Sequence, residues 1–351
     1  MKRLMTLAIS ALLFGSLAFS EIPARLIPTS AEEAAMLAEA DNFIDSLPDG
    51  MQDNQSTAIE RALRGATGDL EKIRLSRSAK YQASPNIEVK EIRENGIQMR
   101  LYRPLNVSDE LPLLVYFHGG GWCFGSLNSC AEFCAALAET GKMAVLAIDY
   151  SLAPENPFPK GMLDCIEGIK IAETSKEAWN ISKISVGGDS AGANLALASA
   201  LYLKSQNEPL PSSLVLIYPV LEINPEKNGS WRKFGRGYGL DRRLMDTFSE
   251  AYQSISEDKQ NETDTLPDYY ISPGNAPEEL IRNLPPVLII NSERDILTDQ
   301  GSRFASRLTA AGCQFDRIEF KGAVHMFATR AGQPTAFRRA VELTQWFVAG
   351  K

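Results

Sequence analysis

The sequence predicts an α/β protein in which helices cover both faces of a central, mostly parallel sheet. From Leu111 onward, short apolar runs alternate with longer segments whose apolar residues recur at helical spacing. Strands that are apolar along their whole length are typical of a parallel sheet buried on both faces. A chain of 351 residues is long enough for one large domain of this kind or for two ordinary ones.

Residues 21–85 precede this alternation and have a different pattern. They are largely polar, with alanine, glutamate and leucine at loose helical spacing, which predicts helices over residues 31–43 and 58–77. We expect this segment to form a helical cap and the catalytic domain to occupy residues 86–351.

A hairpin opens the catalytic domain, and the alternation of strands and helices follows it. Two alternating segments, Ile87–Ile92 and Ile97–Leu101, are joined across Asn95-Gly96, the dipeptide that most strongly indicates a two-residue turn. The later strands are expected at residues 113–117, 143–148, 183–186, 214–218, 287–291 and 315–320. Helices are expected at residues 131–140, 191–204, 301–311 and 334–348.

Residues 221–268 interrupt this alternation. They contain no strand pattern, but they do contain a glycine-rich aromatic stretch, 231–239, followed by a polar helix. We interpret them as an insertion at the carboxyl edge of the sheet that forms a cap together with the N-terminal helices. A plain surface excursion is the alternative, although this segment is long for a loop without structure.

The first twenty residues have the layout of a cleavable secretory signal. A basic start, Met1–Arg3, is followed by the uncharged apolar run Leu4–Phe19, and Ala18 and Ser20 place small residues at the −3 and −1 positions. The run is shorter than the roughly 20 apolar residues that span a bilayer comfortably. We therefore expect cleavage after Ser20 and a secreted or periplasmic protein without a stable membrane anchor.

Composition argues against several classes of function. A formal net charge of −8 does not suit a nucleic-acid partner, which requires a basic surface. With only two histidines, His118 and His325, the chain cannot build a histidine-rich metal site, and we expect neither a metal nor another cofactor. The five cysteines cannot all pair with one another, and we expect most of them to be small buried apolar residues.

Ser190 is the candidate nucleophile. It lies in the segment Gly188-Asp-Ser-Ala-Gly192, between a predicted strand and a predicted helix. So sharp a turn strains the serine backbone, and flanking glycines avoid steric clashes. The hydroxyl is then presented above the sheet edge, as in a nucleophile elbow. A phosphate-binding loop is the alternative, but it requires a Gly-Lys-Ser/Thr ending that is absent here.

A serine hydroxyl needs a base to become nucleophilic, and that base is nearly always histidine. On this type of fold the chain order is serine, acid, histidine. The order selects His325, which follows the last predicted strand, over His118, which lies upstream of Ser190.

The acid is expected after a strand between these two residues. Asp295 stands where a loop leaves the strand at 287–291, so we expect it to orient His325 and to stabilise its cationic form. Glu293 and Asp299 are the alternatives, although Asp299 more simply begins the next helix, where a carboxylate suits the helix dipole.

Backbone donors for the oxyanion are expected in the loop that follows the strand at 113–117. Its glycines let the backbone approach a substrate closely, and the N–H groups of Gly119, Gly120 and Ala191 are expected to form an oxyanion hole. His118 would then brace the loop. Three aromatic residues near the loop mouths are candidates for the pocket wall, with core packing as the alternative: Trp122, Phe124 and Tyr218.

These motifs together resemble the hormone-sensitive-lipase-like family of α/β-hydrolases, the HGGG esterases. The resemblance extends from about residue 86 to the C-terminus. Its motifs are HGGGW at 118–122, DYSLAPE at 149–155, GDSAG at 188–192, DILTD at 295–299 and the pair His325-x-Phe327. Two positions depart from the usual pattern, Ser151 in place of arginine and Met326 in place of glycine, and both leave the serine, acid and histidine intact.

The resemblance implies an α/β-hydrolase fold and a carboxylesterase that acts on small esters of short- to medium-chain acids through an acyl-enzyme, without a cofactor. The same residues would also serve an arylformamidase, a lactonase, an amidase or a peptidase. A non-catalytic binding protein on this fold is a further alternative, but such proteins typically lack the serine or the histidine. The oligomeric state is not predicted.

Overall fold

The computed structural model describes residues 22–77, 81–82, 84–223, 225, 229–254, 266–329 and 331–350. The expected signal at residues 1–20 and the expected cleavage point after Ser20 lie outside the described residues. Within the described ranges, no helix combines the length and the apolar character that crossing a bilayer requires.

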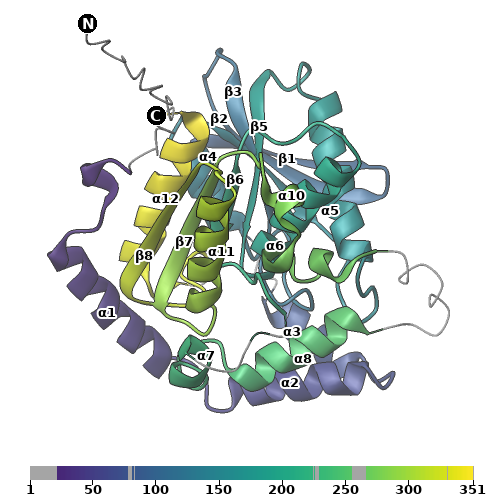
Figure 1. Cartoon of the computed structure of the whole chain (residues 1–351), viewed down its shortest axis with the longest axis vertical. Helices are drawn as coiled ribbons and strands as arrows, with labels where there is room; N and C mark the ends of the chain where they lie inside the picture. Colours follow the sequence, from purple (N-terminus) through teal and green to yellow (C-terminus); the bar gives the residue numbers. More distant parts are fainter. Residues whose placement is uncertain are drawn as a thin grey trace, which may run out of the picture.

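Eight strands form one sheet in the order β1-β2-β4-β3-β5-β6-β7-β8 (Figure 1). The pairs β1–β2 and β2–β4 are antiparallel, and all other neighbours are parallel. The strands are β1 Ile87–Glu94, β2 Ile97–Pro104, β3 Leu111–Phe117, β4 Ala144–Asp149, β5 Ile181–Asp189, β6 Leu214–Ile217, β7 Val287–Arg294 and β8 Phe315–Val324. The predicted fold class is confirmed, and so is the hairpin across Asn95-Gly96.

Successive side chains of a strand point to opposite faces of the sheet, and a helical layer covers each face. Leu113, Val115 and Phe117 of β3 belong to one apolar core, whereas Leu114 and Tyr116 belong to another. The first core includes residues of α5 Lys160–Thr174, α6 Ala191–Ser205 and α11 Thr298–Ala310, and the second includes residues of α4 Ala131–Glu139 and α12 Pro334–Ala349. A short helix, α10 Glu278–Ile281, lies before β7.

Helix α5 was not among the predicted elements, and it contains two residues of low helix propensity, Gly161 and Gly168. Both glycines have a packing reason. A Cβ atom at Gly161 would lie 2.8 Å from the Ser151 carbonyl oxygen, and one at Gly168 would lie 2.7 Å from the Ile148 side chain. Close packing against the end of β4 and the loop after it therefore outweighs the weak local preference.

The helix expected over residues 58–77 is in fact two helices, α2 Met51–Ala62 and α3 Gly68–Arg77. Gly65 separates them with a φ of 88°, in the left-handed region, which a continuous helix cannot contain. The expected insertion contributes α7 Gly229–Lys233 and α8 Arg242–Gln253. Helix α8 packs along α2 (Figure 1).

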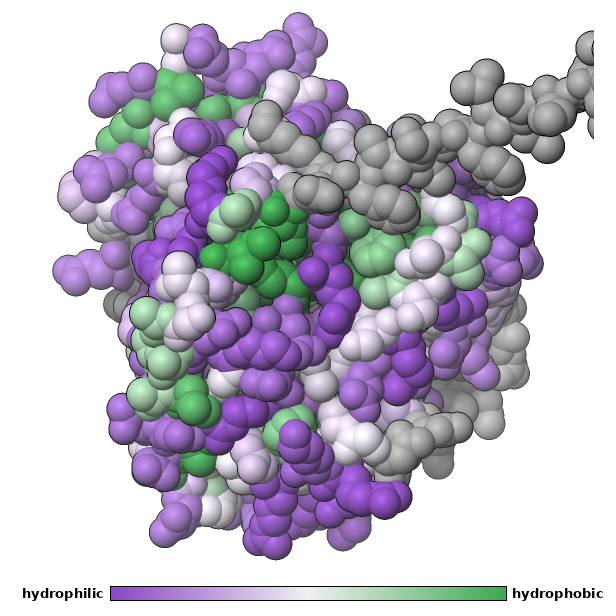
Figure 2. All heavy atoms as spheres, turned by 60° about the vertical axis from the view of Figure 1, so that its left-hand side comes forward, coloured by the Kyte–Doolittle hydropathy of each residue, from purple (hydrophilic) through white to green (hydrophobic). Residues whose placement is uncertain are grey.

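The first helix, α1 Ser30–Asp45, differs from the expected cap because it packs against β8 and α12 at the edge of the sheet (Figure 1). An uncovered edge strand would expose a row of unpaired N–H and C=O groups. The side of the molecule in Figure 2 is largely hydrophilic, with apolar side chains gathered in small patches. Among the described residues before β1, the cavity described below is lined by residues of α2, of α3 and of the segment 81–82, and by none of α1.

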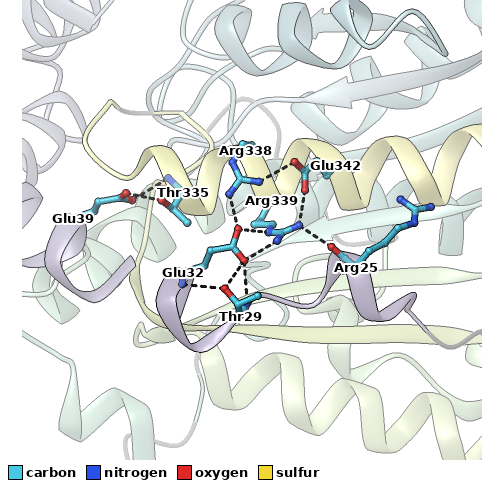
Figure 3. Close-up of polar contacts among 8 residues, drawn as sticks. All are labelled: Arg25, Thr29, Glu32, Glu39, Thr335, Arg338, Arg339 and Glu342. Carbon is cyan, nitrogen blue, oxygen red and sulfur yellow. Dashed lines mark hydrogen bonds and ion pairs between the residues drawn. The ribbon is translucent and has the colours of Figure 1, made fainter. Parts of the chain in front are cut away.

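Two glutamates join α1 to α12 (Figure 3). Glu39 accepts hydrogen bonds from the N–H (2.9 Å) and the hydroxyl (2.6 Å) of Thr335 in the first turn of α12. Glu32 accepts from the guanidinium groups of Arg338 (2.6 Å) and Arg339 (2.7 Å). The bonds from Arg339, together with those from Thr29 and Arg338, hold the pKa of Glu32 well below its usual range.

Candidate active site

Ser190 lies at a sharp turn between β5 and α6, as the glycine pattern predicts. Its φ of 54° and ψ of −118° are strained for a residue with a side chain. A Cβ atom at Gly188 or at Gly192 would clash with the carbonyl oxygen of Phe117 at the end of β3. The two glycines are therefore required because the turn lies directly against the neighbouring strand.

Ser190, His325 and Asp295 form one continuous hydrogen-bonded chain, although they are far apart in sequence. His325 Nε2 lies 3.0 Å from Ser190 Oγ, and His325 Nδ1 lies 2.6 Å from Asp295 Oδ2. The other carboxylate oxygen of Asp295 accepts the N–H of Leu297 at 3.0 Å. All three side chains are buried, with exposures of 6%, 3% and 1%. This geometry allows His325 to remove the Ser190 proton while Asp295 orients the imidazole.

The two alternative acids have other partners. Glu293 accepts the N–H of Gly322 at 2.8 Å. Asp299 lies in the first turn of α11 and accepts the N–H of Ser230 at 2.7 Å. Of the three acids, Asp295 is the one hydrogen-bonded to His325.

The backbone at His325 is held by Gln333, a residue that the sequence did not single out. Gln333 is 1% exposed and precedes α12. Its side-chain oxygen accepts the N–H of Val324 at 3.0 Å, and its Nε2 donates to the carbonyl oxygen of His325 at 3.1 Å. Both bonds depend on the loop folding back on itself, so no local sequence pattern could have revealed them.

The carboxylate of Asp189, next to Ser190, lies in the protein interior. It accepts hydrogen bonds from the hydroxyl of Tyr116 (2.8 Å), the N–H of Gly119 (2.9 Å) and the hydroxyl of Tyr218 (3.4 Å). Burial raises the pKa of Asp189 above its usual value, against the opposing effect of these hydrogen bonds. Asp189 therefore joins the Ser190 turn to the glycine loop.

The bond to Asp189 corrects one expectation for the oxyanion hole. The N–H of Gly119 is already donated to this carboxylate and is not available to a substrate. Across the described part of the chain, the N–H groups of Gly120, Gly121 and Ala191 have no hydrogen-bond acceptor. Gly120 and Gly121 line the same cavity as Ser190. The candidate donors are therefore Gly120, Gly121 and Ala191, so the pair in the loop lies one residue later than expected.

His118 braces the glycine loop from inside the protein. Its Nδ1 lies 2.9 Å from the carbonyl oxygen of Gly119, and its ring stacks on that of Tyr150 with centroids 4.3 Å apart. Desolvation lowers the pKa of His118, which favours the neutral ring. His325, and not His118, contacts the serine.

The three aromatic residues expected in the pocket wall lie beneath it instead. The ring of Trp122 stacks on that of Tyr252 at 4.4 Å, and Phe124 packs edge-on against Phe248 at 5.7 Å. Tyr218 packs behind His325, with ring centroids 4.5 Å apart, and its hydroxyl accepts the N–H of Ala328 at 3.2 Å. The expectation is wrong because these large rings fill the core on which the loops rest.

A cavity of about 560 Å³ lies over Ser190 and His325. Its apolar lining residues include Met51, Leu240, Leu244, Met245, Phe248 and Met326. Its polar lining residues include Ser76, Arg77, Tyr81, Gln82, Asn128 and Ser129. The largest share of the apolar lining thus comes from α8, with Met51 from α2, and the polar lining comes largely from α3, the segment 81–82 and the loop before α4.

A buried Ser–His–Asp chain on a strand-to-helix turn, with unpaired backbone N–H groups beside it, defines a serine hydrolase built on an α/β sheet. The α/β-hydrolase fold family matches residues 114–329, and the chain belongs to the hormone-sensitive-lipase-like members of this family. The resemblance noted from the sequence motifs is confirmed.

Known relatives include esterases of bacterial origin. The chain is 32% identical to Carboxylesterase NlhH of Mycobacterium tuberculosis over 237 residues, which are 67% of this chain and 72% of the relative. It is 31% identical to an ethyl acetate hydrolase of Pseudomonas putida over 238 residues, 66% and 71% of the two chains. The fold also matches the crystal structure of a thermostable esterase from Pseudomonas putida ECU1011, with a TM-score of 0.73, 24% identity and coverage of 90% and 98%.

Proposed function

We propose that this protein is a serine carboxylesterase that hydrolyses esters of short- to medium-chain acids through an acyl-enzyme. His325 Nε2 accepts the Ser190 proton as Ser190 Oγ attacks the ester carbonyl carbon. The oxyanion accepts hydrogen bonds from the N–H groups of Gly120, Gly121 and Ala191. His325 then protonates the leaving alcohol as the C–O bond breaks. Water attacks the acyl-enzyme by the same route, which releases the acid and restores the serine.

The observation that carries this proposal is the arrangement of hydrogen-bonding groups at the base of the cavity. The distance of 3.0 Å from His325 Nε2 to Ser190 Oγ is within the reach of direct proton transfer. The distance of 2.6 Å from His325 Nδ1 to Asp295 Oδ2 matches a charge-assisted hydrogen bond. No cofactor takes part in these steps.

The preference for small acyl chains is supported by the size and lining of the cavity. A volume of about 560 Å³ is typical of small-molecule sites. Its apolar lining residues, which include Leu244, Met245 and Phe248 of α8, can contact an alkyl chain. Long-chain lipid would instead require a wide apolar entrance.

Hydrolysis of p-nitrophenyl esters graded from acetyl to palmitoyl tests the proposal. We expect kcat/KM to be highest between the acetyl and octanoyl esters and to fall for longer chains. A fluorophosphonate should label the wild-type protein completely and should not label Ser190→Ala. A wild-type protein that is not labelled by the fluorophosphonate and hydrolyses none of these esters contradicts the proposal.

The alternative acyl substrates are compared under the same conditions. N-formyl anilides, lactones and anilides use the same nucleophile but release different groups. Higher kcat/KM on one of these classes than on the best ester would assign the site to that class and overturn the ester preference.

We also propose that the protein is exported with removal of residues 1–20. The basic start, the uncharged apolar run and the small residues at 18 and 20 support this proposal. Expression of the full chain in a secreting bacterial host, followed by N-terminal sequencing, should give a mature protein that begins at Glu21. An intact N-terminus at Met1 in the cytosolic fraction contradicts it.

A further inference from the structure

The loop that carries Gly120 and Gly121 has an unusual backbone. Gly120, Gly121 and Trp122 have φ values of 125°, 59° and 59°, so three successive residues lie at positive φ. Such conformations are costly, above all for a residue with a large side chain, and persist only where the surrounding structure holds them. Within the loop, the N–H of Phe124 donates to the carbonyl oxygen of Gly120 at 2.9 Å.

A second loop, which belongs to the DYSLAPE motif at 149–155, supports the first. The N–H of Ala153 donates to the carbonyl oxygen of Trp122 at 2.9 Å. This bond leaves the next carbonyl group, that of Cys123, to be satisfied from another part of the chain.

The group that satisfies it is the guanidinium of Arg74 in helix α3. Arg74 Nε donates to the carbonyl oxygen of Cys123 at 2.8 Å, and Nη2 donates to that of Ala153 at 2.8 Å. Nη1 and Nη2 also bind the two carboxylate oxygens of Glu155 at 2.8 and 2.9 Å. The Arg74 side chain is 21% exposed. Only a planar group with several donors can make this set of bonds, so lysine is not an equivalent.

We infer that Arg74 is a positioning residue for the oxyanion hole, through which helix α3 holds the glycine loop in its active conformation. The carbonyl group of Cys123 that Arg74 binds lies only two residues after Gly121, so loss of Arg74 lets the left-handed segment relax. The N–H groups of Gly120 and Gly121 would then no longer point at the position of the oxyanion. The inference rests on the proposed function, and it assigns to α3 a part in the reaction beyond covering the cavity.

An oxyanion hole that is out of place weakens binding of the transition state more than binding of the substrate. Arg74→Gln should therefore lower kcat by about tenfold to a hundredfold, less than the full loss of one donor. KM for a short aryl ester should change less than about threefold. A trifluoromethyl ketone, which forms a tetrahedral adduct with the serine, should bind more weakly by a factor similar to the loss in kcat.

Three further variants make the experiment specific. Arg74→Lys keeps the charge but loses the planar fork of donors. Its kcat should lie between that of the wild-type protein and that of Arg74→Gln. Glu155→Gln leaves Arg74 able to bind both carbonyl groups. It should therefore lower kcat less than Arg74→Gln does. Arg243→Gln is the matched control, because Arg243 on α8 makes ion pairs with Asp53 (2.9 Å) and Glu60 (3.2 Å) but does not line the cavity.

The concentration of active sites is measured by fluorophosphonate titration, and kcat is expressed per active site. The inference is overturned if Arg74→Gln, or Arg74→Lys where Arg74→Gln does not fold, has the same kcat per active site and the same ketone affinity as Arg243→Gln. A change confined to KM, or to the fraction of folded protein, also overturns it. Failure of the proposed function is distinguishable from failure of this inference, because in that case the wild-type protein itself is inactive on every ester.

Discussion

The turn at Ser190 and the glycine loop at 119–122 meet at one cavity, but they are held in place differently. Ser190 lies at a turn that its own sequence neighbours form, because β5 ends and α6 begins on either side of it, and its N–H donates to the carbonyl oxygen of Ile217 in the adjacent strand β6 at 2.9 Å. The glycine loop is positioned from a distance, by Asp189, by the loop at 149–155 and by Arg74. The nucleophile is therefore presented by a turn between two regular elements of the sheet, whereas the oxyanion hole lies in a loop that depends on side-chain and loop contacts from distant parts of the chain.

Substitutions in the two regions should affect different steps of the reaction. Changes at the Ser190 side should act on proton transfer and on the nucleophile itself. Changes at the loop side should act on stabilisation of the tetrahedral intermediate. The predictions below test this division, and they run from the largest expected effect on activity to the smallest.

Asp295→Asn should lower kcat by about 10³- to 10⁴-fold, because the amide can no longer orient and stabilise a protonated His325. The measurement is steady-state hydrolysis of a short p-nitrophenyl ester. Glu293→Gln is the matched control, since Glu293 bonds the N–H of Gly322 and not the histidine. Equal losses in the two variants would show that Asp295 is not the orienting acid.

Gly119→Ala should lower kcat by about 10²-fold or more, close to the loss of an oxyanion donor. A Cβ atom at this position clashes with the Asp189 side chain, so the loop must move away from the Ser190 turn. Labelling by a fluorophosphonate and hydrolysis rates are compared with those of Gly68→Ala. A Cβ at Gly68, the first residue of α3, meets no atom within 4 Å. Activity of Gly119→Ala equal to that of Gly68→Ala contradicts the proposed tight contact.

Gln333→Ala should lower kcat by about tenfold and reduce the free energy of unfolding by about 1–3 kcal/mol, because a buried N–H and a buried carbonyl group lose their partner. Urea denaturation and kcat are measured on the same preparation. Gln314→Ala, at an exposed position, serves as the control. A loss of stability without any loss of kcat would mean that Gln333 supports the fold but does not position His325.

Glu32→Gln should leave kcat within about twofold but lower the free energy of unfolding at pH 7 by about 1–2 kcal/mol, since it removes the negative charge and one of the two acceptor oxygens that bind the guanidinium groups of Arg338 and Arg339. The pKa of Glu32 is lower in the folded protein than in the unfolded chain, so its contribution is present above the ordinary value of 4.5 and is lost as the pH falls below it. Urea denaturation at pH 7 and pH 4 should show that the wild-type protein and Glu32→Gln differ less in free energy of unfolding at pH 4 than at pH 7. An equal difference in free energy of unfolding at the two pH values contradicts the stabilising role of the Glu32 carboxylate.

Much of the site could be predicted because its signals are local. The alternation of apolar runs and helical segments identified the sheet, and the glycines at 188 and 192 identified the sharp turn at Ser190. The chain order of nucleophile, acid and base then selected His325, and the position after the strand at 287–291 favoured Asp295 over Glu293 and Asp299; the structure brings His325 and Asp295 into contact. The placement of the N-terminal helices is less local: α1 packs against β8 and α12, whereas α2 and α3 contribute residues to the cavity.

By itself, the sequence determined the order of the elements and the residue types available for catalysis, because hydrophobic period and backbone sterics act over a few neighbouring residues. Only the tertiary structure decided which N–H groups remain unpaired, and it moved the expected donor from Gly119 to Gly121. It also decided that the large aromatic residues lie beneath the pocket, and that Gln333 and Arg74 support its two loops. Hydrogen bonds between distant parts of the chain form only after packing has brought their partners together, so no local pattern encodes them.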